Sequence, residues 1–361
     1  MGRIVSLIFD SFKGSIGAAE IGGIVCEKLS PILPKVELVN FPASDGGDGF
    51  VEALAYHTGG EPVECEVADP LGRRRTARYI WSGAGRTAII ESAEANGLTL
   101  LADDERDPLK TTTRGVGELL LDAASRGAER IIIGVGGSAT VDGGVGMAEA
   151  LGFEFSDAYG IIPPGACALA DIEILVACDV RTELLGPRHS SAVWIYGPQK
   201  GGTEQSLCAI EKSLTRIDRL VRTKLGLEYG RLEMGGAAGG LAAGLAVFAG
   251  AELRQGIRLF DDLAGLSRQI DESALVITGE GRLDEQSAEG KVVSYVSRAA
   301  RRAGVPVIAL CGCACEHSID FDAVFCLTDS GKSVEECIAG PPAAVAEVIP
   351  RLAASIREHL S

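Results

Sequence analysis

A glycine-rich segment in the middle of the chain, "IIIGVGGSATVDGG" at residues 131–144, combines residue types that bind anions. Its glycines leave backbone N–H groups accessible, Ser138 and Thr140 supply hydroxyls, and Asp142 adds a carboxylate. Successive backbone N–H groups in a loop form a favourable environment for phosphate or carboxylate oxygens. The candidate binding residues of this loop are Gly136, Gly137, Ser138, Asp142 and Gly143.

Similar combinations of small residues with an acid or a cation recur in loops that follow apolar, strand-like segments. Metal-bridged phosphate needs them, because carboxylates bind Mg²⁺ and lysines neutralise phosphate oxygens. In open α/β sheets ligands bind at the carboxyl ends of the strands, where these loops lie. The further candidates are Asp10, Ser11 and Lys13 in "DSFKGS", Asp45, Gly46 and Gly47 in "SDGGDG", Asp179 in "ACDV", Lys200 in "GPQKG", and Glu280, Arg282, Asp284 and Lys291 in "TGEGRLDEQSAEGK".

Each of these loops also has a purely structural explanation, since Asp-Gly pairs form turns and Ser or Asp caps helices. The surroundings of three lysines favour a ligand-binding function over a purely structural one. Lys13 and Lys200 lie among glycines and small residues that offer no apolar surface for their stems. Lys291 opens a predicted helix, where a positive charge is unfavourable unless an anion binds there.

Other reaction classes fit the sequence less well. There is no G-x-S-x-G elbow for acyl transfer and no Walker P-loop, since Val292 follows the Gly-Lys pair. Gly134, Gly136 and Ala139 satisfy a relaxed dinucleotide-binding pattern, with Glu154 about twenty residues further on. The loop nevertheless continues through "DGGVG", whereas a dinucleotide-binding turn enters a helix directly, which argues against NAD.

The amino-acid composition limits the classes of binding partner and the cellular locations that we expect for this protein. The formal net charge of −16 disfavours nucleic acid. The ten cysteines are scattered, many of them in apolar surroundings, and we interpret them as reduced. The N-terminus does not resemble a signal peptide, and the Gly/Ala stretch after Glu233 is a poor membrane span. We therefore expect a cytoplasmic protein that binds neither nucleic acid nor membrane.

The 361 residues exceed what one core usually organises, so two domains are predicted. Strand–loop–helix units begin and end the chain, while "VECEVADPLGRRRTARYIW" indicates an antiparallel hairpin. The predicted fold class is α/β, with two domains. One is an open, doubly wound flavodoxin- or Rossmann-like sheet from residues 1–61 and 271–361, and the other is an inserted mixed-sheet α/β domain at 62–270.

In this order, "DSFKGS", "DGGDG", "TTTRGVGEL", "IGVGGSATVDGG", "ACDV", "GPQKG" and "TGEGRLDEQSAEGK" make nearly the whole chain resemble the type I glycerate kinase family. The resemblance implies Mg²⁺-assisted transfer of the γ-phosphoryl group of ATP to D-glycerate, giving 2-phosphoglycerate, with 3-phosphoglycerate as the alternative product. It also implies two α/β domains with the active site in the cleft between them. Phe9, Asp48 and Val141 replace the family's usual Pro, Glu and Asn, and "CGCAC" at 311–315 replaces a glycine-serine loop, so no role is carried over to that segment.

For such a reaction, the catalytic candidates are Asp179, Asp284 and Lys291. We hypothesise that Asp179 or Asp284 orients the substrate hydroxyl, that Lys13 and Lys291 pair with anions, and that Arg282 clamps the glycerate carboxylate. Which loops hold ATP and which hold glycerate stays open, as do the metal ligands. Two other classes also remain: an NAD-dependent oxidoreductase of a small hydroxy acid, and a non-catalytic hydroxy-acid binder. A homodimer is the candidate assembly.

Overall fold

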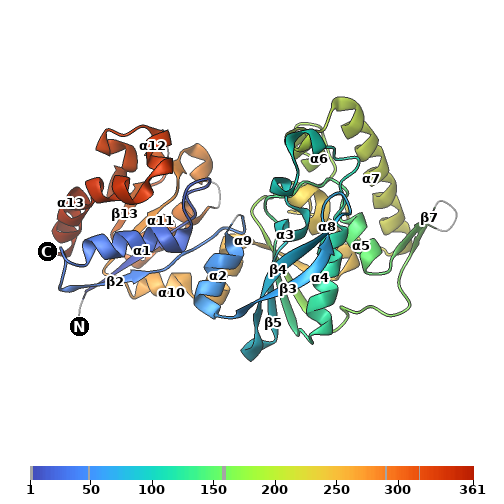
Figure 1. The fold of residues 1–361 in the computed structure, drawn as a ribbon, viewed down its shortest axis with the longest axis horizontal. Coiled ribbons are helices and arrows are strands. Elements are labelled where there is room, and N and C mark those ends of the chain that lie inside the picture. Colours follow the sequence, from blue (N-terminus) through green and yellow to red (C-terminus); the bar gives the residue numbers. More distant parts are fainter. Residues whose placement is uncertain (1–2, 48, 157–159, 289–290, 317) are drawn as a thin grey trace. The chain divides into compact units, whose positions relative to one another are not determined.

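The computed structural model describes residues 3–47, 49–156, 160–288, 291–316 and 318–361. The chain divides into two compact units (Figure 1). The first unit combines both chain ends, residues 1–58 and 257–361, and the second comprises residues 59–256. No helix in the described part of the chain is long and apolar enough to cross a bilayer.

The first unit contains a five-stranded sheet in which every pair of neighbours is parallel. Its strand order is β15-β13-β11-β1-β2, which is the flavodoxin-like order when the strands are numbered within the unit. The predicted open sheet from both chain ends is therefore confirmed. The strands are β1 (Arg3–Phe9), β2 (Val36–Asn40), β11 (Leu275–Gly279), β13 (Val307–Cys311) and β15 (Ala323–Cys326).

Helices cover both faces of this sheet. On one face, α1 and α13 pack on residues such as Leu7, Ile277 and Leu310. On the other face, α11 packs on β11 and β13 and also contacts α10. The helices of the unit are α1 (Ala18–Leu29), α2 (Phe50–Thr58), α9 (Gly256–Ala264), α10 (Leu266–Asp271), α11 (Val292–Ala303), α12 (Val334–Ala339) and α13 (Pro341–Leu360).

The observed unit boundaries differ from the expected ones mainly where the chain returns from the second unit to the first. Residues from Ile257 onward belong to the first unit, whereas the sequence places this boundary after residue 270. Helix α9 explains the difference, because the ring of Phe260 meets those of Phe50 and His57, at centroid distances of 6.4 and 5.8 Å. Helix α9 thereby packs on α2.

The second unit contains a six-stranded mixed sheet in the order β10-β9-β6-β5-β4-β3. Strands β3 and β4 form the predicted antiparallel hairpin, β4 pairs antiparallel with β5, and the remaining neighbours are parallel. The strands are β3 (Glu61–Ala68), β4 (Arg74–Ser82), β5 (Thr87–Glu91), β6 (Arg130–Gly134), β9 (Glu173–Cys178) and β10 (Glu252–Gln255), and a separate hairpin consists of β7 (Glu154–Ser156) and β8 (Gly160–Ile162).

The strand order of this sheet follows the chain, so successive right-handed crossovers place helices on the same face. Accordingly α5 contacts both α4 and α8, and the three helices share one core with the sheet. The Gly/Ala stretch leads into the short buried helix α8. The helices are α3 (Ala93–Asn96), α4 (Arg114–Ser125), α5 (Val145–Ala150), α6 (Ala192–Tyr196), α7 (Glu204–Lys224) and α8 (Leu241–Phe248).

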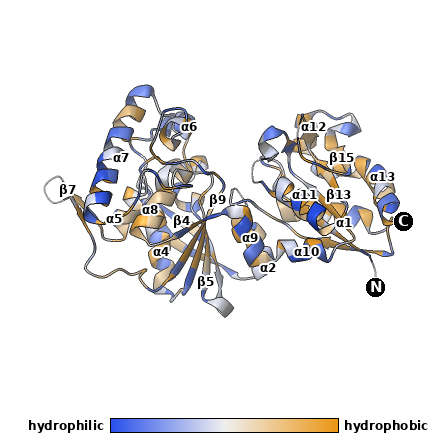
Figure 2. Cartoon of the chain, turned by 180° about the vertical axis from the view of Figure 1, so that it is seen from behind, coloured by the Kyte–Doolittle hydropathy of each residue, from blue (hydrophilic) through white to orange (hydrophobic). Residues whose placement is uncertain are grey.

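Hydropathy follows this layering. Figure 2 shows hydrophobic residues concentrated on the strands, whereas α7 carries long hydrophilic stretches. In α7 the buried residues Leu207, Ile210, Leu214 and Val221 lie on one side. A capping box closes its start, where Thr203 Oγ1 accepts from Ser206 N–H at 3.2 Å. Helix α7 is thus an amphipathic cover of the second unit's core.

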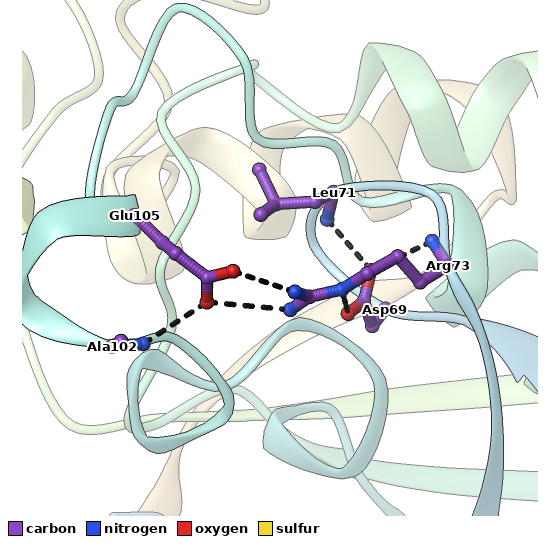
Figure 3. Close-up of polar contacts among 5 residues, drawn as sticks. All are labelled: Asp69, Leu71, Arg73, Ala102 and Glu105. Atoms are coloured by element: carbon purple, nitrogen blue, oxygen red, sulfur yellow. Dashed lines mark hydrogen bonds and ion pairs between the residues drawn. The ribbon is translucent and has the colours of Figure 1, made fainter.

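An ionic network fixes the turn between β3 and β4 (Figure 3). Asp69 accepts hydrogen bonds from the N–H groups of Leu71 and Arg73, at 2.9 and 2.8 Å, and its other oxygen lies 2.5 Å from Arg73 Nε. The same guanidinium donates to Glu105 at 2.6 Å, and Glu105 also accepts from Ala102 N–H. The network therefore joins the hairpin turn to the segment that precedes α4.

We expect Arg73→Met to lower the free energy of unfolding by about 1–3 kcal/mol, because the buried Asp69 carboxylate loses its cation. Burial raises the pKa of Asp69, but the hydrogen bonds from Arg73 and Leu71 outweigh it and lower this pKa below its ordinary value. The stabilisation is thus present above the ordinary carboxyl pKa and is lost as the pH falls through the lowered one. Urea unfolding at pH 7 and at pH 3 measures both effects.

The control for this prediction is Arg86→Met, which removes an exposed ion pair with Glu129. Exposed pairs contribute about 0–1 kcal/mol. Equal effects of the two substitutions would contradict a special role for the Asp69 network.

Candidate active site

The strand order of the first sheet reverses between its neighbouring strands β1 and β11. In sheets of this kind ligands bind outside the carboxyl ends of the strands at the point of reversal. Strand β1 ends at Phe9, so Asp10 follows it, and β11 ends at Gly279, so Glu280 follows it. The N–H of Asp10 donates to the carbonyl of Gly279 at 3.0 Å. Two of the candidate loops of the first unit therefore start side by side.

Three carboxylates gather at this edge, and we call Asp10, Asp45 and Glu280 the acidic cluster. All three are buried, with Asp10 only 4% exposed. Burial and the charge of Asp45 raise the pKa of Asp10 well above its ordinary value, and Glu280 adds to the increase. Burial likewise raises the pKa of Glu280, although hydrogen bonding by Ser287 opposes it. The acidic cluster thus brings three carboxyl groups together where water solvates them poorly.

The loop after β2 shapes its part of the cluster through a turn. The Oδ1 atom of Asp45 accepts from Gly47 N–H at 3.1 Å, and Ser44 Oγ accepts from Gly46 N–H at 3.4 Å. Gly46 has φ of 99°, a conformation that favours glycine. Asp48, the other acid of this loop, lies outside the described residues. The Asp-Gly-Gly sequence is therefore a turn that also presents a buried carboxylate.

The acidic cluster has the donor chemistry of a Mg²⁺ site. Glu280 Oε1 is buried and has no hydrogen-bond partner in the described structure, so a cation would satisfy it. Within residues 3–361, apart from the undescribed positions, no group of three or more His, Cys, Asp or Glu side chains has metal-ligating geometry. Mg²⁺ that bridges substrate phosphates requires only one or two carboxylates, since water and phosphate oxygens complete its shell. The residues present fit such an ion.

Two lysines flank the acidic cluster. Lys291 is the N-cap residue of α11, and its Nζ lies 3.9 Å from Glu280 Oε2. Lys13 is exposed, and its charge lowers the pKa of Asp10 against the larger effect of burial. A lone lysine is unfavourable at a helix N-terminus, and here the nearby Glu280 carboxylate compensates the positive charge of Lys291. Each lysine therefore lies near a carboxylate of the acidic cluster.

Arg282 and Asp284 lie in the loop after β11. The guanidinium Nε is 3.4 Å from Asp284 Oδ2, and the Arg282 side chain is 67% exposed. The N–H of Asp284 donates to Ser287 Oγ at 3.1 Å, which closes the turn that follows. This loop thus offers an accessible cation next to a carboxylate.

The glycine-rich loop of the second unit, residues 135–144, follows β6 at the carboxyl edge of its sheet. The next helix, α5, begins only at Val145, so the predicted extended loop is confirmed. Gly136 is buried, while Gly137 is exposed, has φ of 66° and accepts a hydrogen bond from Leu98 N–H at 2.8 Å. A dinucleotide-binding turn, which needs a helix at once, is therefore absent from this loop.

Asp142 holds this loop in place. One carboxylate oxygen accepts from Thr113 N–H, Thr113 Oγ1 and Gly146 N–H, at 2.8, 2.9 and 3.2 Å. The other accepts from Gly144 N–H at 3.0 Å. Both oxygens thus satisfy N–H groups at the starts of α4 and α5. Burial raises the pKa of Asp142 although these hydrogen bonds oppose the shift.

Gly143 is needed for packing. Tyr229 Oη donates to its carbonyl at 2.7 Å, and a Cβ on Gly143 would lie 2.0 Å from that hydroxyl oxygen. Its φ of 68° also favours glycine. The residues Asp142 and Gly143, both expected to bind ligand, therefore have clear functions inside the protein.

Lys200 and Ser138 meet beneath the glycine-rich loop. Lys200 Nζ donates to Ser138 Oγ at 2.7 Å and to the carbonyl of Thr140 at 2.8 Å, and Lys200 is only 4% exposed. Burial lowers the pKa of Lys200 to about 7, although the charge of Asp142 opposes the shift. A buried lysine with neutral hydrogen-bond partners is a costly group to retain.

Asp179 follows β9, the neighbour of β6, and is exposed. Because parallel strands end at the same edge, Asp179 and the glycine-rich loop share the carboxyl edge of the second sheet. The structure thus groups Ser138, Lys200 and Asp179 at one sheet edge of the second unit. It groups Asp10, Lys13, Asp45 and Lys291 at one sheet edge of the first unit.

The sequence places Glu280 among the candidate loop residues but gives it no specific role, although this glutamate completes the acidic cluster. The available signal was its position directly after a buried strand, between two glycines. Thr113 and Tyr229, which hold the glycine-rich loop, carry no local signal because their partners lie far away in the chain.

Comparison with known proteins identifies the family of the chain. A model of the glycerate kinase family matches residues 5–357. The chain is 39% identical over 352 residues to the glycerate 2-kinase of Escherichia coli K12, with 92% of each chain covered. It is 37% identical over 371 residues to the glycerate kinase of Bacillus subtilis 168, with 96% of each covered.

A crystal structure of a candidate glycerate kinase 2 from Salmonella typhimurium LT2 superimposes with a TM-score of 0.86. The two chains are 37% identical, and 99% of each is covered. The resemblance noted in the loop segments therefore extends to the whole fold. This chain belongs to the glycerate kinase family, and it is a kinase that transfers a phosphoryl group to an alcohol acceptor.

Proposed function

We propose that this chain phosphorylates D-glycerate with MgATP and releases 2-phosphoglycerate. The observation that carries the proposal is the acidic cluster between Lys13 and Lys291 at the point of strand-order reversal. Phosphoryl transfer depends on positioning and charge neutralisation, which carboxylate-bound Mg²⁺ and lysines supply. The name of the Escherichia coli relative, glycerate 2-kinase, supports the regiochemistry.

In this proposal the acidic cluster holds the metal. Asp10, Glu280 or Asp45 would hold Mg²⁺, which would supply neutralisation of the charge that develops on the transferred phosphoryl group. Lys13 and Lys291 pair with the phosphate oxygens directly. The unpartnered Glu280 Oε1 and the raised pKa of Asp10 support this assignment, since both are relieved by a bound cation.

The remaining candidates bind and orient the acceptor. The exposed backbone of Gly137, with the neighbouring Gly136 and with Ser138 above Lys200, forms an anion cradle. Asp179 or Asp284 orients the substrate hydroxyl, and the exposed guanidinium of Arg282 pairs with the glycerate carboxylate. Ser11, Gly46 and Gly47 contribute by shaping the loops that carry the acidic cluster.

The two alternative classes lose support. An NAD-dependent oxidoreductase needs a turn that runs directly into a helix, and ten residues separate the end of β6 from the start of α5. A non-catalytic binder does not agree with membership in a kinase family. A cytoplasmic location and a homodimer stay part of the proposal, and the ten free thiols fit a reducing compartment.

The test couples the reaction to enolase. Enolase acts on 2-phosphoglycerate directly, whereas 3-phosphoglycerate reaches it only when phosphoglycerate mutase is added. We expect absorbance from phosphoenolpyruvate with enolase alone, and dependence on ATP, Mg²⁺ and D-glycerate. A signal that appears only with mutase would overturn the regiochemistry. ADP release with no dependence on D-glycerate would overturn the substrate.

A further inference from the structure

Two neighbouring parallel strands of the first unit end in cysteines that face each other. Cys311 at the end of β13 and Cys326 at the end of β15 are direct partners in the strand ladder. Side chains of direct partners lie on the same face of a sheet, and adjacent strands are about 4.8 Å apart. That spacing falls within the Cα separation of about 4.4–6.8 Å that a disulfide spans. The two thiols are already hydrogen-bonded to each other.

The two thiols differ in environment. Cys311 is fully buried against Leu283 and Val293, whereas Cys326 is only half-buried. The S–H of Cys311 donates to Cys326, and this hydrogen bond lowers the pKa of Cys326 and raises that of Cys311. Thiolate character and access both favour oxidation. Cys326 is therefore the thiol that an oxidant reaches first, and Cys311 is its resolving partner.

The segment after Cys311 holds the loop that carries Glu280. Gly312 N–H donates to the carbonyl of Glu280 at 3.1 Å, and Cys313 N–H donates to that of Gly281 at 3.1 Å. The short strands β12 (Arg282–Leu283) and β14 (Cys313–Ala314) then pair in parallel. A Cβ on Gly312 would lie 2.3 Å from the Gly281 oxygen, so the two backbones approach too closely for any side chain at position 312.

We propose that Cys311 and Cys326 are an oxidation-sensitive dithiol, which a hydroperoxide converts into a disulfide and a dithiol reductant restores. The Cys326 thiolate attacks the peroxide, whose O–O bond breaks to give a sulfenic acid and an alcohol or water. Cys311 then attacks the sulfenic sulfur, the S–O bond breaks and water leaves. The peroxide takes up the two electrons that the thiols lose.

Disulfide formation brings the sulfurs from hydrogen-bonding separation to about 2.05 Å. Because the strand spacing already suits a disulfide, closing the S–S bond rotates both side chains and tightens the ends of β13 and β15, and the Gly312 contact passes this movement to Glu280 and Arg282. The effect on turnover rests on the proposed function. A displacement of about 1 Å lowers turnover by up to about 100-fold. We therefore expect oxidation to lower glycerate kinase turnover by about tenfold or more.

The experiment treats the reduced, full-length protein with hydrogen peroxide, blocks the remaining thiols and maps cross-linked peptides by mass spectrometry. We expect a Cys311–Cys326 peptide that has lost two hydrogens, reduced turnover, and recovery of both after dithiothreitol. Cys326→Ser and, separately, Cys311→Ala are expected to keep their turnover during the treatment. Cys167→Ser, which removes an exposed cysteine elsewhere, is the control and should stay sensitive.

Several outcomes would overturn the proposal. A cross-link of Cys326 to Cys313 instead would reject this pair, and inactivation that persists in Cys326→Ser would place the sensitive group elsewhere. A disulfide that forms without changing turnover would remove the regulatory consequence. The peptide map needs no enzymatic activity, so failure of the proposed glycerate kinase reaction is recognised separately.

Discussion

Lys200→Met is expected to raise the thermal stability of the protein and at the same time to lower turnover by at least about 100-fold. Lys200 is buried, and among the described residues it donates only to the neutral oxygens of Ser138 and Thr140. Methionine has a similar length and no charge, and such replacements of buried charges stabilise by about 1–4 kcal/mol. Turnover falls because the glycine-rich loop loses the cation beneath Ser138. Calorimetry and the enolase-coupled assay measure the two effects.

The stability gain has a defined pH dependence. Burial lowers the pKa of Lys200 to about 7 in the folded protein, while the unfolded chain keeps the ordinary value near 10.5. Below pH 7 the folded wild type bears the full cost of a buried charge. Its stability rises between pH 7 and 10.5, because only the unfolded chain then binds the proton. The advantage of Lys200→Met is therefore largest at pH 6 and disappears near pH 10.5.

Lys212→Met is the matched control, since Lys212 is an exposed lysine of α7. It should change stability by no more than about 0.5 kcal/mol and leave turnover intact. A Lys200→Met protein that melts below the wild type at pH 6, or that retains turnover, would contradict the functional assignment.

The second large effect is expected for Asp10→Asn. In the wild type, MgATP at about 100 times its dissociation constant should add about 2.7 kcal/mol of stability. Asp10→Asn should lose most of this gain and reduce turnover by about 1,000-fold, because the acidic cluster loses a metal ligand. Without metal, the variant should melt above the wild type, since one buried negative charge beside Asp45 has been removed.

The pH dependence of metal-free stability checks the same residue. Burial and Asp45 raise the pKa of Asp10 in the folded protein. Between the ordinary carboxyl pKa and the raised one, the folded state binds more protons, so stability falls as the pH rises through this window. Asp10→Asn should flatten that decline. Glu20→Gln, which alters an exposed acid of α1, is the control, and an unchanged MgATP-induced shift in Asp10→Asn would refute the metal site.

Most strands of the two sheets were predictable from local sequence, because the central ones are short apolar runs next to a glycine or an acid and β3 and β4 alternate in polarity, whereas the short polar β10 was missed. "IIIGV" and "ALVITG" are too short for helices and are rich in β-branched residues. The assignment of α9 and α10 to the first unit was not predictable from local sequence. Their periodicity indicates helices, but which unit they join depends on contacts such as Phe260 with Phe50, more than two hundred residues apart.

The candidate site was likewise predictable in part, in its loops but not in the directions of its side chains. The loops could be located from the sequence, since ligand-binding loops follow the strands of an α/β sheet. The direction of each side chain could not. Asp142 turns inward to Thr113, whereas Glu280 joins Asp10, and neither orientation is encoded in residue type or spacing. The burial of Lys200 likewise results from packing of the segment around residues 198–200 against the glycine-rich loop.

The discontinuous first unit has a consequence for synthesis. When residue 256 has left the ribosome, the second unit is complete and its strands already pair in chain order. The first unit then has only β1 and β2, and β11, the partner of β1 in the centre of the sheet, has not been made. The inserted unit therefore folds first, while β1 and β2 remain without their later partner strands and expose unpaired edges. Premature termination near residue 260 would leave a folded second unit attached to an aggregation-prone N-terminal segment.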